Sequence, residues 1–163
     1  MLILREALTD DAELLWLALT YAASMTPGGH SNIADAKNNA SLAWYVCNWK
    51  RATDFGVIAE EAGVFLGAVW ARLLEGSPQS SKVATKVEPE VAIAVLPEHQ
   101  NRGLGLLLIQ ALIAQARLKV PVLVLSVREE NPAVRLYERL GFVIERTMVN
   151  RVGGVSFAMR LAL

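Results

Sequence analysis

The sequence is poor in the residues that build disulfides and metal centres. It contains one cysteine, Cys47, and two histidines, His30 and His99. A lone cysteine cannot form a disulfide within the chain, and these few residues form no cluster at metal-ligand spacing. We therefore expect no metal. We interpret Cys47 as a small core residue of a helical stretch, with an acyl-carrying nucleophile as the alternative.

The sequence also lacks an excess of charge of either sign, and it lacks long apolar runs. Sixteen basic residues balance sixteen acidic ones, so no general attraction to nucleic acid or to anionic lipid is expected. The longest apolar runs, 104–109 and 120–125, are far shorter than a membrane span, and the N-terminus lacks the basic start of a signal peptide. We expect a cytoplasmic protein with no nucleic-acid or membrane partner.

The chain does contain enough apolar material for one core. Of its 163 residues, 53% are hydrophobic and 20% are charged, which is typical of a compact globular domain. No repeat or low-complexity tract divides the sequence. We expect a single domain over residues 1–163.

Hydrophobic periodicity and turn residues predict a mixed order of strands and helices. Asp10 and Glu13 form a plausible capping box for a first helix, and a second helix is expected through Trp44 and Trp49. The order of elements implies an α/β fold, with a mixed sheet and helices on both of its faces. The predicted strands are 2–7, 57–60, 64–70, 88–96, 121–127, 142–150 and 155–161.

A basic, glycine-containing turn, Gln100 to Gly105, joins a predicted strand to a predicted helix. The first turn of a helix has backbone N–H groups without intrahelical partners, and the helix dipole adds partial positive charge there. Gly103 and Gly105 allow a ligand to approach the main chain, Arg102 adds a full charge, and the side chains of Gln100 and Asn101 add amide donors. The segment therefore predicts a site for phosphate or pyrophosphate.

Two common nucleotide motifs fit this turn poorly. A dinucleotide fingerprint requires a third glycine at position 108, where the chain has Leu108, and the Gly-Lys-Ser/Thr of a phosphate-binding loop is absent. An ordinary tight turn is the remaining alternative to an anion site.

A second informative segment runs from Asn131 to Phe142. Asn131 is a good N-cap, Pro132 suits the first helical position, and Gly141 suits a left-handed stop. The segment predicts a short helix of about two and a half turns.

Together the two segments resemble the signatures of the GCN5-related N-acetyltransferases (GNAT). The first contains the Gln/Arg-x-x-Gly-x-Gly/Ala pattern, and the second is similar to the family's Asn-Pro-Ala…Leu-Tyr…Gly-Phe pattern. The resemblance covers most of the chain, weakly before about residue 55. It implies the acyl-CoA N-acyltransferase fold and acetyl-CoA as co-substrate.

The resemblance also implies how acetyl-CoA would bind. The pyrophosphate would lie on the signature loop, and the pantetheine arm would lie like an extra strand along the preceding strand, which splays from strand 121–127. The Val95 N–H would face the thioester oxygen. The residues implied in binding are Ile93, Ala94, Val95, Gln100, Asn101, Arg102, Gly103, Leu104, Gly105, Leu106, Asn131 and Tyr137.

For catalysis, the family motif places Tyr137 as the acid that protonates the departing CoA thiolate; its alternative is a core tyrosine. Glu90 is the nearer match to the glutamate that often serves as base, with Glu88 on the same strand face. The alternative for both glutamates is a solvated charge. His30, on a glycine-rich turn, is a weaker candidate for the base. We expect Asn131 to cap its helix; the resemblance implies that it also bonds the pantetheine arm, with capping alone as the alternative.

In this fold the acceptor pocket is built from the region between the first two helices and from the third strand. The expected walls therefore include residues 25–32 with His30, Trp44, Trp49, Trp70 and Arg72. Trp70 and Arg72 alternate on one strand face and would suit an apolar acceptor with a carboxylate or phosphate. The tryptophans are equally compatible with the core.

These observations predict an acetyl-CoA-dependent N-acetyltransferase that works by direct attack in a ternary complex. A small amine or amino-acid-like metabolite is the first expectation for the acceptor, and a protein N-terminus or lysine is the second. A non-catalytic acyl-CoA sensor and a nucleotide-binding regulator are the rival classes. Phe157, Met159 and Leu161 of the closing hairpin offer an apolar surface for a possible homodimer.

Overall fold

The chain folds around a mixed β-sheet. The computed structural model describes residues 1–22, 32–75, 88–149 and 153–163. Within them the sheet has seven strands in the order β1-β2-β3-β4-β5-β7-β6. Only the β4–β5 pair of neighbours is parallel. The strands are β1 (Leu2–Glu6), β2 (Phe55–Glu61), β3 (Val64–Leu73), β4 (Pro89–Val95), β5 (Val122–Arg128), β6 (Val143–Val149) and β7 (Val155–Ala162).

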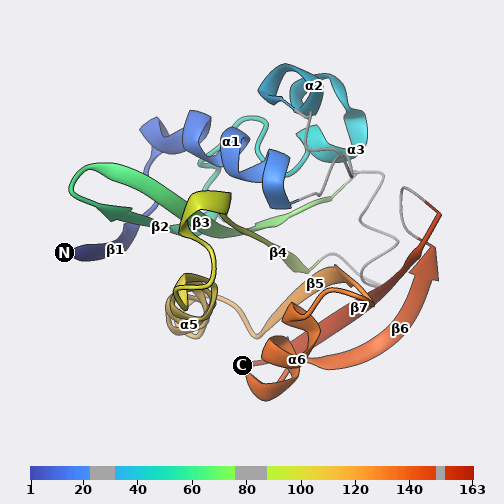
Figure 1. Cartoon of the computed structure of the whole chain (residues 1–163). Helices are drawn as coiled ribbons and strands as arrows, with labels where there is room; N and C mark the ends of the chain where they lie inside the picture. The colour runs from blue at the N-terminus through green and yellow to red at the C-terminus, as the bar shows by residue number, and fades with distance from the viewer. Residues whose placement is uncertain (23–31, 76–87, 150–152) are drawn as a thin grey trace.

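Helices cover both faces of this sheet (Figure 1). On one face lie α1 (Ala12–Ala22), α2 (Ile33–Asn38) and α3 (Ala40–Ala43); on the other lie α5 (Leu104–Ala116) and α6 (Ala133–Arg139). The predicted α/β class with a mixed sheet is therefore confirmed. No helix in the described ranges is long and apolar enough to cross a membrane.

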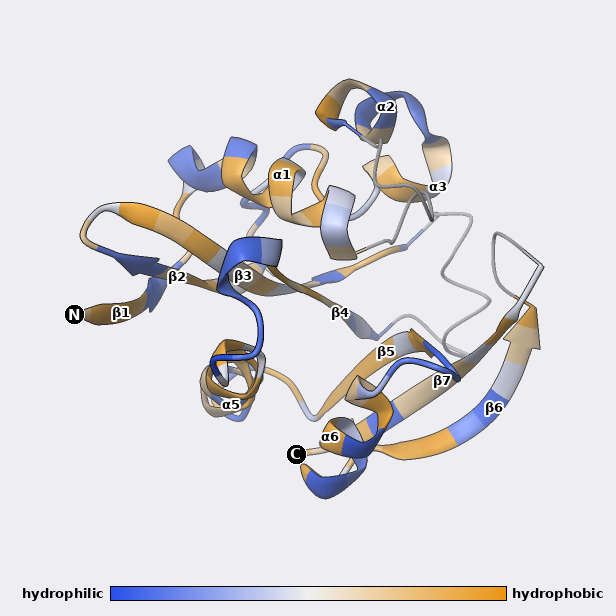
Figure 2. Cartoon of the chain, in the orientation of Figure 1, coloured by the Kyte–Doolittle hydropathy of each residue, from blue (hydrophilic) through white to orange (hydrophobic). Residues whose placement is uncertain are grey.

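Each face of the sheet has its own apolar core, because side chains of a strand point alternately to opposite faces. Leu108 and Leu123 belong to the core beneath α5 and α6, whereas Leu15 and Trp70 belong to the core beneath α1 to α3. Figure 2 shows the hydrophobic strands in orange, and the hydrophilic segment between β4 and α5 in blue.

The start of the first helix differs from the prediction. A 3₁₀ turn, η1 (Thr9–Asp11), precedes α1, so Asp10 and Glu13 do not form the capping box. Instead the buried Asp11 carboxylate accepts a 2.6 Å hydrogen bond from the Leu8 N–H and two 2.9 Å bonds from Arg5. Arg5 lowers the pKa of Asp11. The sequence pattern around residues 9–13 does not reveal that Asp11 pairs with Arg5 of β1.

The predicted second helix through Trp44 and Trp49 is also wrong. Two short helices, α2 and α3, precede this region and are capped by the Asn32 and Asn39 side chains, which accept bonds from Asp35 N and Ser41 N. Residues 44–48 then form turns, and Asn48 (φ 56°) and Lys50 (φ 80°) adopt left-handed conformations that end any helix.

The sheet is splayed between β4 and β5. A single register pair, Glu90 with Val124, joins them, whereas β3–β4 and β5–β7 each have seven pairs. The predicted separation of these two strands is therefore confirmed. Beyond Glu90, no register pair joins β4 to β5 in the described residues.

Candidate active site

The N-terminus of α5 forms an open cradle. Gly103 is the N-cap, with a left-handed φ of 77°, and Asn101 has a φ of 61°. A Cβ added at Gly103 or Gly105 would meet no atom within 4 Å. The first helical hydrogen bond runs from Leu107 N to Gly103 O, so the preceding amides of the first turn have no intrahelical acceptor. The cradle can therefore accept an anion that approaches the main chain.

The polar side chains of the loop have internal partners. Gln100 Nε2 donates to the Val95 carbonyl at 3.0 Å and ties the loop to the end of β4. Arg102 pairs with Glu61 at 3.1 Å and lies 3.4 Å from His99 Nδ1, and its charge lowers the pKa of Glu61. Gln100 thus shapes the loop, while the half-exposed Arg102 keeps positive charge beside the cradle.

The main chain of β4 has a free edge beside this cradle. Leu96 N donates to Leu66 O, so residues 94 and 96 direct their polar main-chain groups toward β3. By the alternation of an antiparallel ladder, Ile93 and Val95 direct theirs toward the side where β5 has separated. Apart from the Val95 carbonyl, which already accepts from Gln100, this edge can pair with the amides of an extended ligand.

Tyr137 lies on α6, which packs against β5, the strand that separates from β4. Asn131 Oδ1 accepts a 2.9 Å bond from Ala133 N, as expected of a capping residue, and the chain turns at Gly141 with a φ of 103°. Tyr137 is 6% exposed, and its ring centroid lies 5.7 Å from that of Phe142. Burial raises the pKa of Tyr137 to about 12, so the phenol stays protonated across the physiological range.

Glu90 is a buried carboxyl at the point where the splay begins. It is 3% exposed, and neither oxygen has a regular hydrogen-bond partner among the described residues. Burial raises the pKa of Glu90 to about 8, and the nearby Tyr45 side chain opposes that shift. Glu90 shares its strand face with Ala92, in the core under α1, whereas Tyr137 belongs to the opposite core. The two candidate catalytic groups therefore lie on opposite faces of the sheet.

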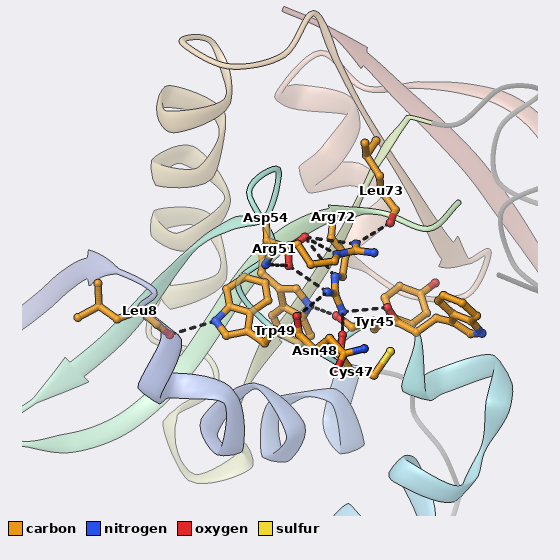
Figure 3. Close-up of polar contacts among 11 residues, drawn as sticks. Leu8, Tyr45, Cys47, Asn48, Trp49, Arg51, Asp54, Arg72 and Leu73 are labelled. Carbon is orange, nitrogen blue, oxygen red and sulfur yellow. Dashed lines mark hydrogen bonds and ion pairs between the residues drawn. The ribbon is translucent and has the colours of Figure 1, made fainter. Parts of the chain in front are cut away.

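Arg72 is enclosed by a set of internal acceptors (Figure 3). The side chain is fully buried, and its guanidinium binds Asp54 through Nε at 3.3 Å and through Nη2 at 2.9 Å. The remaining bonds run to the main-chain oxygens of Trp44 (3.2 Å), Cys47 (2.7 Å) and Asn48 (3.5 Å). All five donors of an arginine are thus used.

This geometry corrects the predicted role of two acceptor-site residues. Arg72 has no donor left for an acceptor, and Trp70 is fully buried, with its indole N–H bonded to Tyr45 O at 2.8 Å. Both are structural residues that hold the turn at 44–48 against β3. Trp49 is also buried, with its indole N–H bonded to Leu8 O. His30 and residues 25–31 lie outside the described residues.

Two polar residues of this region were not found by sequence reasoning. Asp54 stands at the start of β2 without a periodic pattern, and Tyr45 was assigned to a helix. One feature of the sequence points to a residue such as Asp54: a charged residue inside an apolar strand, here Arg72, requires a buried partner of opposite charge.

A family model described as "Acetyltransferase (GNAT) family" matches residues 16–142. The chain belongs to the GNAT acetyltransferase family. This confirms the resemblance drawn from the two signature segments.

Two curated GNAT relatives match parts of the chain. One is the mycothiol acetyltransferase of Acidimicrobium ferrooxidans, 35% identical over 98 residues, which cover 59% of this chain and 30% of the relative. The other is the ribosomal protein bS18-alanine N-acetyltransferase of Haemophilus influenzae, 51% identical over 51 residues, covering 31% of this chain and 35% of the relative. The chain thus spans about a third of the length of these relatives.

Solved structures are similar over the full domain. The yncA protein of Salmonella typhimurium, assigned as an acetyltransferase and solved with its cofactor acetyl-CoA, has a TM-score of 0.72 at 24% identity, covering 100% of this chain and 94% of that one. Ribosomal-protein-alanine N-acetyltransferase from Brucella melitensis has a TM-score of 0.71 at 21% identity, covering 99% of each chain. These likenesses confirm the acyl-CoA N-acyltransferase fold.

Proposed function

We propose that this GNAT domain transfers the acetyl group of acetyl-CoA to a primary amine by direct attack in a ternary complex. The observation that carries the proposal is the free edge of β4, created by the single β4–β5 pair, next to the glycine cradle of α5. The proposal assigns residues 1–163 to one catalytic domain that acts in the cytoplasm.

The residues present fit acetyl-CoA as co-substrate. The cradle around Gly103 and Gly105 has open space where a Cβ would lie and would hold the pyrophosphate. The main-chain groups of Ile93 and the Val95 N–H would pair with the pantetheine arm and its thioester, and Asn131 would add an amide group to these contacts. Acetyl-CoA supplies an acetyl group activated as a thioester.

Three groups of the chain then act on the reaction. Glu90 accepts a proton from the substrate ammonium, so that the neutral amine can attack the thioester carbon. The Val95 N–H stabilises negative charge on the thioester oxygen, and the Tyr137 hydroxyl donates to the departing sulfur. Support for this division comes from the positions of Glu90 and Tyr137 on opposite faces of the sheet, flanking the splay. An amine can approach from one side while the thiolate leaves on the other.

A small amine or amino-acid-like metabolite is the acceptor we favour. Glu90 is 3% exposed, so only a slender aminoalkyl group can bring its nitrogen to this carboxyl. The second candidate is the N-terminal amine of a protein. It is favoured by the 51% identity to the bS18-alanine N-acetyltransferase over the matched segment.

The test is a calorimetric titration of the wild type and of Gly103→Glu with acetyl-CoA, CoA, ATP and NAD. We expect the CoA species alone to bind the wild type, and the variant to lose this binding because a carboxylate would occupy the anion cradle. Release of CoA is then measured with ethanolamine, spermidine, L-alanine and a peptide that begins with alanine. Binding of ATP but not of acetyl-CoA would contradict the proposal.

A further inference from the structure

The sheet consists of two halves joined by a narrow seam. The first half contains β1 to β4 with α5, and the second contains β5, β7 and β6 with α6. Within each half, neighbouring strands share five to seven register pairs, whereas among the residues that the structure describes one pair, Glu90 with Val124, joins the halves. The hydrogen-bond ladder alone therefore constrains the angle between them weakly.

An ion pair crosses this seam. Arg160 Nη1 on β7 donates to Glu88 Oε1, directly before β4, at 2.6 Å. Because β5 lies between β4 and β7, the pair spans two strand spacings, about 10 Å of sheet. Val124 pairs with both Glu90 and Arg160, so the ion pair braces the sheet at the row where its two halves meet.

The burial of this pair makes its loss consequential. The Glu88 side chain is 4% exposed and that of Arg160 is 28% exposed. Without Arg160, a buried carboxylate would remain unpaired two residues from Glu90, itself buried and without a regular hydrogen-bond partner. The other carboxylate near Arg160, Glu145, lies farther away at 3.7 Å and is 37% exposed, so it contributes less.

The groups assigned to the reaction are divided between the two halves. Ile93 and Val95 belong to β4, whereas Tyr137 belongs to α6, which packs on β5. The distance between the oxyanion donor and the phenol therefore depends on the angle at the seam.

Resting on the proposed function, we propose that Arg160 is a positioning residue. By binding Glu88 across β5, it fixes the angle between the half-sheets and so aligns Tyr137 with the thioester held along β4.

The test compares three variants of the full chain: Arg160→Met, Arg160→Lys as the conservative replacement, and Glu145→Gln as the matched control. Values of kcat and of KM for acetyl-CoA are measured with whichever amine of the panel is accepted, per folded enzyme. In parallel, spin labels on Val64→Cys and Val143→Cys, at exposed positions of the two halves, report the distance between the halves in a Cys47→Ser background.

We expect Arg160→Met to lower kcat at least about tenfold, since a displacement of 1 Å can cost about a hundredfold. KM for acetyl-CoA should change less than about threefold, because the cradle and the β4 edge belong to one half. The label distances should broaden, Arg160→Lys should restore much of both properties, and Glu145→Gln should resemble the wild type.

An unchanged label distribution in Arg160→Met, or a kcat within about twofold of the wild type, would overturn this inference. A loss of activity that disappears on normalisation to folded protein would overturn it as well. If the wild type acetylates no amine of the panel, the proposed function fails on its own. The label distances then still decide whether Arg160 fixes the seam.

Discussion

Arg72 and Glu90 are directly opposite neighbours on β3 and β4, yet the carboxylate that the Arg72 guanidinium binds is Asp54. Its remaining donors are taken by three main-chain carbonyls. Glu90 therefore stands beside a cation that is neutralised by another carboxylate. Burial of Glu90 is opposed only by Tyr45, and the pKa of Glu90 is raised because desolvation outweighs that contact.

The first prediction concerns the pH dependence of the reaction. Burial raises the pKa of Glu90 to about 8, so Glu90 is largely protonated at pH 6 and accepts a proton only as the pH rises. We expect kcat/KM to increase through pH 8 and Glu90→Gln to lose this limb, with a fall of about a hundredfold or more at pH 8.5. The measurement is a pH profile of CoA release. A variant that keeps the limb near pH 8 would assign it to another group.

The second prediction separates an enzyme from an acyl-CoA sensor. Tyr137→Phe retains the ring that packs against Phe142 and removes the hydroxyl that we assign to the departing sulfur. We expect kcat to fall about a hundredfold, with affinity for CoA unchanged in calorimetry. Tyr21→Phe, at a 44% exposed position, is the matched control and should keep full activity. A wild type that binds acetyl-CoA and never turns it over would favour the sensor.

The third prediction concerns the buried Arg72–Asp54 pair. Both side chains are fully buried, so Arg72→Met leaves the Asp54 charge in the interior and frees three carbonyls. We expect the free energy of unfolding to drop by about 3 to 5 kcal/mol, measured by urea denaturation. Arg51→Met removes a 36% exposed partner of the same Asp54 and should cost less. Equal costs for the two variants would contradict a special role for Arg72.

Those parts of the fold that follow from local chemistry were predicted correctly. The glycine turn before α5 and the capping of α6 by Asn131 depend on residues within a few positions of one another. The predicted strands 57–60 and 64–70 are likewise joined by a tight turn, in which Ala62 (φ 51°) and Gly63 (φ 76°) are left-handed.

The elements that were predicted wrongly depend on partners that lie far away in the sequence. Trp70 and Arg72 bind the main-chain carbonyls of residues 44–48, which lie 24 to 28 positions away along the sequence. The sequence of residues 44–48 contains no sign of these distant contacts, and its apolar pattern taken alone predicts a helix. Likewise, the partner of Asp11 is Arg5 on β1.

The bonds by which Trp70 and Arg72 hold the turn at residues 44–48 end on main-chain oxygens, which every residue possesses. Arg72 would find the same acceptors if Trp44 or Cys47 carried other side chains. The side chains of this turn can therefore be replaced while its backbone stays bonded to Trp70 and Arg72 of β3. If Glu90 is the base as we propose, we expect substitutions in this turn to alter the preference for the acceptor without refolding of the backbone.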